Sequence, residues 1–402
     1  MNGIATQSPT GEHKDGGAQL VAPVYTLRKG SRESEKSKDV VSMPRSFLFQ
    51  ACLSALLAFS CVNEPFAAEP FYQGKTLRVI VASAAGGGSD IVARLMMRHL
   101  PRHIPGNPTI VVENMPGAGE IIGTNYVYGK AKPDGLTALF ATGTPINQLI
   151  ELPGIEFDVT KMPIIGGSSE SVAAFIRTDK TGVKSARDLL NPKAPIVIGG
   201  SGYGSIKDVS MLAAMNLLGV KSPTYVTGYG GAGPIRLAYE RAEVNFTQET
   251  AVGISRSVLP WVREGWTSIL YQVGFLDGKG NVAKDPAWKE LGIDAPSITE
   301  VYRAVYGRDA AGPAWDAEKA LIGGYSLTRM MAVAPKTPPA LIADLRQAFQ
   351  AMGKDQAFLA EWTKSQGSPP RLIPGEEAGS IAASILKAPR EAVNILKKLS
   401  AP

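Results

Sequence analysis

The sequence predicts an α/β protein with largely parallel sheets. From Thr76 onward, short β-branched runs alternate with helical stretches, the pattern of strands connected by helices. Three of these strands lead through a glycine-rich loop directly into a helix. The chain has 402 residues, of which 44% are hydrophobic and 19% are charged. That size and balance allow two compact soluble domains.

The individual elements follow from hydrophobic periodicity and from glycine or proline at their ends. The expected strands are Leu77–Ala82, Thr109–Glu113, Thr137–Ala141, Ala173–Arg177, Ile196–Gly199, Thr224–Thr227, Val244–Thr247, Ser268–Gln272 and Met331–Ala334. The expected helices include Ser89–Arg102, Gly119–Gly129, Ser185–Leu190, Ser205–Leu218, Pro234–Arg241, Pro338–Met352 and Ile381–Lys398. No internal repeat of fixed period is visible.

The N-terminal segments differ from the rest of the chain. Residues 1–42 are polar and lack apolar periodicity, so we expect a disordered extension or a start codon assigned too early. Residues 43–68 combine Arg45, an apolar run and a small-residue end, the layout of a secretory signal peptide. A buried helix is disfavoured because the run lacks a polar face. We therefore expect Met43 as the true start and export of the mature chain.

Both cysteines, Cys52 and Cys61, lie in this leader, and lipidation of Cys61 remains an alternative. The segment after the leader therefore offers no thiol for disulfides, catalysis or metal binding. The formal net charge of +6 is spread along the chain, and no run of five Lys or Arg residues occurs. This disfavours nucleic acid as a partner and suits a receptor for small anions.

The three glycine loops have the same position in their units. They are Ser83–Asp90, Gly200–Ser205 and Gly228–Gly233, each between an expected strand and an expected helix. In α/β sheets such loops gather beyond the carboxyl ends of the strands, where helix N-termini favour negative charge. One such loop alone would be read as an ordinary tight turn. Three in matching positions predict an anion site.

The sequence offers few residues that are suited to catalysis. Gly228–Gly233 matches the dinucleotide pattern G-x-G-x-x-G, but no second nucleotide-binding half accompanies it. Tyr203 occupies the position where a hydrolase elbow around Ser201 needs glycine. His99 and His103 have metal-ligand spacing but no third ligand nearby, so we interpret them as surface residues. We expect neither catalysis, nor a metal, nor a cofactor.

Taken in order, the loops resemble the tripartite tricarboxylate transporter substrate-binding family, the Bug-type receptors. The resemblance covers about residues 72–400. Its motifs are Leu77–Val81 with the loop to Asp90, Ala93-Arg94, Val112–Gly119 with Gly123, Lys132–Gly135, Gly200–Ser205, Tyr229–Gly233 and Ala334–Pro338. It implies a type II periplasmic binding protein fold, in which two α/β domains are joined by crossover hinge strands and a ligand cleft lies between them.

The resemblance also implies domain boundaries and ligand-binding residues. Domain 1 is expected to comprise 69–176 and 329–402, domain 2 is expected to comprise 177–328, and the hinge lies near Ala173–Arg177 and Tyr325–Ala334. The implied ligand-binding residues line the three glycine loops and two further strand ends: Ala84, Ala85, Gly86, Gly87, Gly88, Asp90, Thr142, Thr144, Asn147, Ser201, Gly202, Ser205, Gly230, Gly231, Ala232, Gly233, Glu249 and Thr250.

Three features depart from the family pattern. Many relatives have Pro-Pro where this chain has Ala84-Ala85, and His is frequent where this chain has Lys207. The region Tyr271–Trp315 is longer than in typical members. The substitution at Lys207 adds a positive charge near the expected cleft.

The function implied is that of a periplasmic solute-binding protein. It would capture a small carboxylate by domain closure and deliver it to the membrane permease subunits of a tripartite transporter, working as a monomer. The alternative is a receptor that presents its closed form to a sensor kinase and has no transport role. The ligand could be a dicarboxylate, a tricarboxylate, an aromatic acid or an amino acid.

Overall fold

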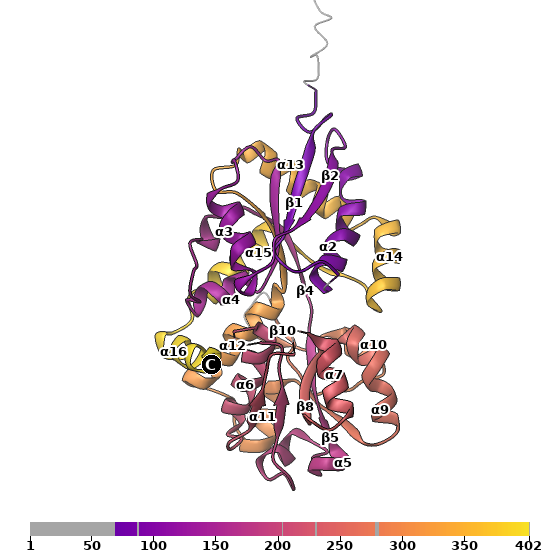
Figure 1. Cartoon of the computed structure of the whole chain (residues 1–402), viewed down its shortest axis with the longest axis vertical. Helices are drawn as coiled ribbons and strands as arrows, with labels where there is room; N and C mark the ends of the chain where they lie inside the picture. The colour runs from indigo at the N-terminus through magenta and orange to yellow at the C-terminus, as the bar shows by residue number, and fades with distance from the viewer. Residues whose placement is uncertain (1–68, 87, 203, 230, 278–280, 402) are drawn as a thin grey trace, which may run out of the picture. The chain divides into compact units, whose positions relative to one another are not determined.

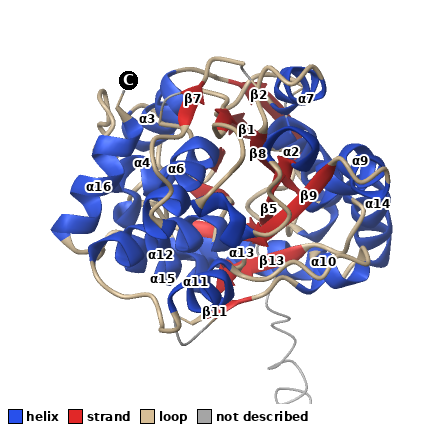
Figure 2. Cartoon of the chain, turned by 90° about the horizontal axis from the view of Figure 1, so that it is seen from below, coloured by secondary structure: helices blue, strands red, loops and turns tan. Residues whose placement is uncertain are grey.

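The computed structural model describes residues 69–401, apart from residues 87, 203, 230 and 278–280 (Figure 1). The predicted extension, 1–42, and the predicted signal peptide, 43–68, lie outside the described residues. Two β-sheets organise the described part, and helices flank the strands on both sides (Figure 2). The fold is thus α/β with two lobes, as the sequence predicts.

The first sheet has six strands in the order β13-β4-β12-β3-β1-β2. Their bounds are β1 (Thr76–Val81), β2 (Thr109–Asn114), β3 (Thr137–Thr142), β4 (Ile164–Ser169), β12 (Arg329–Val333) and β13 (Arg371–Pro374). β1 pairs in parallel with β2 and β3, whereas β12 runs antiparallel to β3 and β4. The expectation of largely parallel sheets is therefore wrong. The chain leaves this sheet at the end of β4 and enters β12 on the same side of the sheet. The two neighbouring strands therefore run in opposite directions.

Each face of the first sheet carries its own core because successive side chains of a strand point to opposite faces. Val79 and Val81 of β1 pack with the helices α2 (Gly88–His99), α13 (Pro339–Met352) and α14 (Gln356–Gln366). Ile80, between them, packs with α3 (Ile121–Gly129) and α15 (Gly375–Ile385). Residues from both ends of the described chain thus build one lobe, as the indigo and yellow elements of Figure 1 show.

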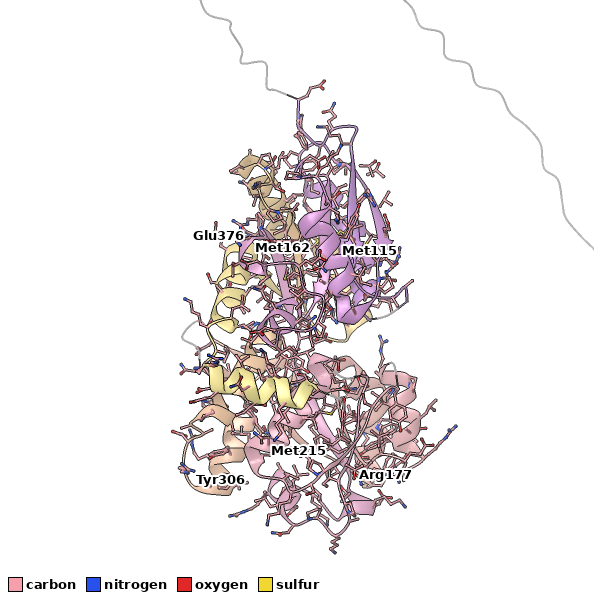
Figure 3. The ribbon with its side chains drawn as sticks, turned by 60° about the vertical axis from the view of Figure 1, so that its left-hand side comes forward. Met115, Met162, Arg177, Met215, Tyr306 and Glu376 are labelled. Atoms are coloured by element: carbon pink, nitrogen blue, oxygen red, sulfur yellow. The ribbon has the colours of Figure 1, made fainter. Side chains whose placement is uncertain are left out.

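The second sheet has five strands in the order β7-β6-β8-β5-β9. Their bounds are β5 (Val172–Arg177), β6 (Val197–Gly199), β7 (Thr224–Val226), β8 (Phe246–Thr250) and β9 (Thr267–Gln272). One face packs against α6 (Ile206–Leu218), α11 (Ile298–Tyr306) and α12 (Pro313–Ser326). The other packs against α7 (Ala232–Glu240), α9 (Leu259–Arg263) and α10 (Pro286–Glu290). In Figure 3, Met215 and Arg177 mark this lobe, and Met115 and Met162 mark the first.

The remaining elements are short, except for the C-terminal helix. They are η1 (Pro101–His103), η2 (Ala118–Glu120), α4 (Thr144–Leu149), η3 (Val159–Lys161), α5 (Thr178–Thr181), η4 (Ala186–Leu190), α8 (Ala251–Gly253), η5 (Ile254–Val258), β10 (Phe275–Leu276), β11 (Val282–Ala283) and α16 (Arg390–Ser400). The single helix expected over Ile381–Lys398 is wrong. Pro389 cannot continue a helix, and the chain breaks there into α15 and α16.

Three segments of the described chain connect the lobes. Glu170 and Ser171 lie between β4 and β5, Leu327 and Thr328 lie between α12 and β12, and residues 386–389 lie between α15 and α16, which packs on α6 and α12 of the second lobe (Figure 1). Thr328 ties the first two segments together because its hydroxyl accepts a hydrogen bond from the Glu170 amide at 3.1 Å. β5 pairs only with strands of the second sheet, so the first crossing precedes Ala173. The domain boundaries 69–176 with 329–402, and 177–328, stay a prediction.

Candidate functional site

The carboxyl edges of the two sheets carry the predicted loops and face each other. A β-carbon placed on Gly143, before α4, would lie 3.9 Å from the β-carbon of Ile206, the first residue of α6. One placed on Gly204 would lie 3.3 Å from Leu152 Cδ2. The start of α4 in the first lobe therefore lies against the start of α6 in the second. Such facing strand ends are where α/β proteins bind ligands.

The first glycine loop is exposed, and the buried side chain of Asp90 holds it in place. Ala84, Ala85, Gly86 and Gly88 are all exposed, whereas Asp90 is 3% exposed. The Gly86 amide donates to Asp90 Oδ2 at 2.8 Å, and Asn114 Nδ2 donates to Asp90 Oδ1 at 2.9 Å. Burial opposes ionisation of Asp90, but hydrogen bonds from Arg94, Gly86 and Asn114 outweigh it and lower the pKa. Asp90 thus shapes the loop, and the Gly86 amide is already used. Gly87, also predicted to bind, lies outside the described residues.

Polar side chains surround the end of β3. The hydroxyls of Thr142 and Ser89 lie 2.7 Å apart, and the Thr142 amide donates to Glu120 Oε2 at 2.5 Å. Burial raises the pKa of Glu120 to about 7, although its bonds to Thr142 and the charge of Arg329 lower it. Glu120 follows Ala118 and Gly119, and all three have positive φ. A strained segment of this kind is common at functional sites.

Thr144 and Asn147 belong to α4 and are buried. Asn147 Nδ2 donates to the Gly119 carbonyl at 2.8 Å, so this side chain holds the strained loop in place. Thr144 Oγ1 is buried and has no hydrogen-bond partner among the described residues. Ser83 Oγ, just beyond the end of β1, is also buried without a hydrogen-bond partner among the described residues. Buried hydroxyls without partners are uncommon and each needs an explanation.

The second glycine loop is organised by Asp208, which is 1% exposed. Its carboxylate accepts hydrogen bonds from the amides of Ser201, at 2.9 Å, and Gly202, at 3.0 Å. It also accepts from the hydroxyls of Tyr225, at 2.5 Å, and Thr227, at 3.0 Å. Ser205 caps α6 by accepting from the Asp208 amide at 3.2 Å. The amides of Ser201 and Gly202, predicted as ligand donors, are therefore occupied within the protein.

The third loop and the end of β8 complete the second edge. Ala232 and Gly233 form the first turn of α7 after Gly231, and Gly230 lies outside the described residues. Glu249 is 6% exposed and accepts from Arg236 Nη1 at 3.1 Å. Thr250 caps α8 by accepting from the Gly253 amide at 3.3 Å. Glu249 lies where the sequence places it, but Arg236 neutralises its charge.

His99 and His103 lie outside this site. The interpretation as a surface residue is wrong for His99, which is 6% exposed and whose Nε2 lies 2.5 Å from Glu361 Oε2. His103, at the end of η1, is partly exposed, and its Nε2 lies 2.9 Å from Asp355 Oδ2. The two histidines therefore join the end of α2 and η1 to α14 and its N-cap. The sequence could not show this because their partners are more than 250 residues away.

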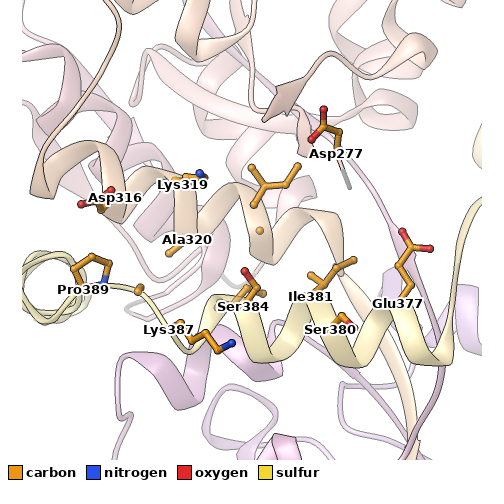
Figure 4. Close-up of a pocket in the computed structure, with 14 residues that line it drawn as sticks. Asp277, Asp316, Lys319, Ala320, Glu377, Ser380, Ile381, Ser384, Lys387 and Pro389 are labelled. Carbon is orange, nitrogen blue, oxygen red and sulfur yellow. The ribbon is translucent and has the colours of Figure 1, made fainter. Parts of the chain in front are cut away.

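A separate hollow of about 570 Å³ lies between α12 and α15 (Figure 4). Its lining mixes acidic side chains, Asp277, Asp316 and Glu377, with the cations Lys319 and Lys387. No glycine loop or strand carboxyl end of the two large sheets opens into it. The predicted site residues lie instead at the facing edges, where helix starts and polar side chains from both lobes meet.

No family model matches the chain. Among curated proteins, the UPF0065 protein in the TAR-I ttuE-ttuC' intergenic region of Agrobacterium vitis is 26% identical over 172 residues, which are 42% of this chain and 48% of that protein. Protein BugT of Bordetella pertussis is 32% identical over 94 residues, 23% of this chain and 28% of BugT. The chain thus matches half or less of the length of these relatives.

Solved structures match over most of the chain. A Polaromonas TctC solute-binding protein has a TM-score of 0.58 at 19% identity, covering 82% of this chain and 98% of that one. BugD has a TM-score of 0.54 at 20% identity, with coverage of 82% and 98%. The resemblance to the Bug-type receptors is confirmed. MatC of Rhodopseudomonas palustris, solved with malate, has a TM-score of 0.52 at 20% identity, with coverage of 82% and 99%.

The structure also brings charged residues to the site that the sequence did not indicate. Glu120, Arg236 and Arg329 lie at the facing edges but were not among the predicted site residues. The signal for Glu120 was its position directly after the Pro-Gly-Ala-Gly motif. Arg236 and Arg329 carry no local motif, and only the fold brings them to Glu249 and Glu170.

Proposed function

We propose that this chain is an exported solute-binding protein that captures a small carboxylate by closure of its two lobes and delivers it to a tripartite-type membrane transporter. The observation that carries the proposal is that two sheets present their glycine loops to each other and are connected by short chain crossings. Two lobes connected in this way can rotate about the crossings and enclose a ligand. No helix among the described residues is long and apolar enough to cross a membrane.

Carboxylates are the ligand class that the relatives favour. MatC was solved with malate, and a second R. palustris protein, with a TM-score of 0.56 at 19% identity, was solved with adipate. The facing edges of this chain supply hydroxyls at Ser89, Thr142 and Thr144, together with nearby cationic side chains. Hydroxyl and cationic donors suit a carboxylate better than a neutral ligand.

A thermal-shift screen tests ligand capture. Malate, adipate and a wider set of mono-, di- and tricarboxylates are added to the purified protein. A ligand at 100 times its dissociation constant is expected to add about 2.7 kcal/mol to the free energy of unfolding. The matching neutral amide of each hit serves as the control, and its affinity is expected to be about ten- to a hundredfold weaker because a charge-assisted hydrogen bond is lost. Equal binding of acid and amide would contradict the proposal.

Closure and export need separate measurements. Small-angle scattering is expected to show a smaller radius of gyration when an identified acid saturates the protein. Intact-mass analysis of exported protein is expected to show a chain that begins near Glu69. The alternative role, signalling through a sensor kinase, shares the binding step and differs in the partner, so co-purification with permease subunits separates the two.

A further inference from the structure

Lys207 is a cationic residue at the facing edges of the two lobes. It lies in the first turn of α6, directly after Ile206, which contacts the start of α4. Its backbone carbonyl accepts from Gln248 Nε2 at 2.8 Å, and Gln248 Nε2 also donates to the Tyr325 hydroxyl at 2.8 Å. The Lys207 backbone is thus fixed against β8 and α12, at the facing edges of the lobes.

The Lys207 ammonium has no hydrogen bond or ion pair with any described residue. Its charged neighbours are Asp208, Glu249 and Arg236. Asp208 already accepts four hydrogen bonds, and Glu249 is paired with Arg236. The two acidic neighbours are therefore held by other groups, and Lys207 is left as a cation without a dedicated partner in this part of the structure.

The Lys207 side chain is partly exposed, so its ammonium is accessible to a ligand. Partial burial lowers the pKa of Lys207, although Glu249 and Asp208 act to raise it. An ammonium that forms no ion pair with the described residues adds little to the stability of the fold through its charge. A bound anion would give that charge a partner.

Other donors at the second edge are already engaged. The amides of Ser201 and Gly202 bind Asp208, and Arg236 binds Glu249. Gly200 lies so close to this network that a β-carbon on it would be 2.3 Å from Asp208 Oδ2. Two more buried atoms without partners among the described residues are Gln248 Oε1, on the residue that binds the Lys207 carbonyl, and Thr144 Oγ1, on the residue after Gly143. Both are acceptors, and Thr144 can also donate.

We propose that Lys207 is the residue that ion-pairs with a carboxylate of the ligand and thereby selects an acid over its neutral analogue. The inference rests on the proposed function, because it assigns the charge-recognising group of that site. Thr144 then donates from the first lobe to the same ligand. The cation is uncompensated in the free protein, and the ligand supplies the missing negative charge when the lobes enclose it.

The test measures two acids and their neutral analogues on two proteins. Isothermal titration with malate, adipate, malamide and adipamide is carried out on the wild type and on Lys207→Met. Wild type is expected to prefer acid over amide by about ten- to a hundredfold, and Lys207→Met is expected to lose most of that preference. Lys221→Met is the matched control, because Lys221 is exposed just beyond the opposite end of α6. It is expected to bind like wild type.

A stability measurement separates recognition from structure. Lys207→Met is expected to melt close to the wild-type temperature at pH 7, because the ammonium forms no ion pair or hydrogen bond with the described residues whose loss would weaken the fold. Lys207→Gln provides a second neutral variant if the methionine protein does not fold. Full acid preference in a folded Lys207 variant would overturn the inference and leave the proposed function standing. Wild type that binds no carboxylate of a broad screen would overturn both.

Discussion

Glu170 and Arg329 form an ion pair of 2.6 Å where the chain passes between the two sheets. The side chains are 19% and 10% exposed, so water screens them little. Arg329 Nε is buried and has no partner among the described residues. The pair joins one crossing segment to the strand that follows the other, and it therefore lies on the expected axis of lobe movement.

Loss of this pair is expected to weaken the fold at the crossings. Arg329→Met leaves the Glu170 carboxylate without its cation and should lower the free energy of unfolding by about 1–3 kcal/mol. Urea unfolding measures the change. The double variant Glu170→Gln with Arg329→Met is the control, and its loss should be smaller than the sum of the two single losses. Additive losses would show that the two residues do not interact.

Asp208 is expected to be the main support of the second glycine loop. Asp208→Asn removes the charge that four donors share, and in either orientation its amide nitrogen would face a backbone N–H that can only donate, so a loss of at least about 2 kcal/mol is expected. Asp188→Asn is the control, because Asp188 also accepts backbone hydrogen bonds but does so on an exposed turn. Chemical denaturation that ranks the two variants equally would contradict this assignment.

Glu318 predicts a pH dependence of stability. It is fully buried in α12, both carboxyl oxygens lack partners among the described residues, and burial raises its pKa from 4.5 to about 8. Between these two pH values the folded state binds more protons than the unfolded state. The contribution of Glu318 to the free energy of unfolding is therefore fully present below pH 4.5 and is lost as the pH rises through 8. In thermal scans from pH 5 to 9, Glu318→Gln should flatten this loss.

The control for Glu318 is Glu391→Gln, which changes an exposed glutamate on α16. That variant should follow the wild-type curve at every pH. At pH 8 the Glu318→Gln protein should be more stable than wild type by about 1–3 kcal/mol. A wild-type curve with no decline between pH 5 and 8, relative to Glu318→Gln, would mean that the buried carboxyl does not titrate in this range.

His99 is expected to matter for stability and not for binding. His99→Ala removes the bond to Glu361 and the edge contact with Phe358, whose ring centre is 5.6 Å away, so about 1–3 kcal/mol should be lost. His99 ends α2, whereas the glycine loop precedes the start of that helix. Urea unfolding and titration with an identified acid check the two parts. A binding defect in folded His99→Ala protein would place the ligand differently.

Strand β4 shows where sequence reasoning failed on the fold. Most strands contain β-branched runs and were predicted to within two or three residues, but β4 reads Ile-Ile-Gly-Gly-Ser-Ser and was missed. A β-carbon on Gly166 would lie 2.3 Å from the Phe349 ring, and one on Gly167 would lie 2.6 Å from the Arg329 carbonyl oxygen. The glycines are required by neighbours from distant parts of the sequence, and a local pattern cannot show such neighbours.

In the candidate site, too, local sequence predicts the position of the loops but not their contacts. The three glycine loops follow strands and precede helices, as their composition predicts. Their chemistry did not follow from composition, because it depends on which groups are already engaged. Asp90 looked like a ligand contact and proves to support its loop, and the amides of Ser201 and Gly202 are taken by Asp208. The isolation of Lys207 is visible only when all of its neighbours are known.

The position of β12 has a consequence for the order in which the lobes can be assembled. β12 lies between β3 and β4, so the first sheet has a gap until residue 333 has been synthesised. The second sheet uses only residues 172–272 and has all its strands much earlier. Until then β3 and β4 each lack a partner on the side of that gap, although β1 can already pair with β2 and β3, and such open strands are prone to aggregation and to capture by chaperones. The first sheet is therefore the last to be completed.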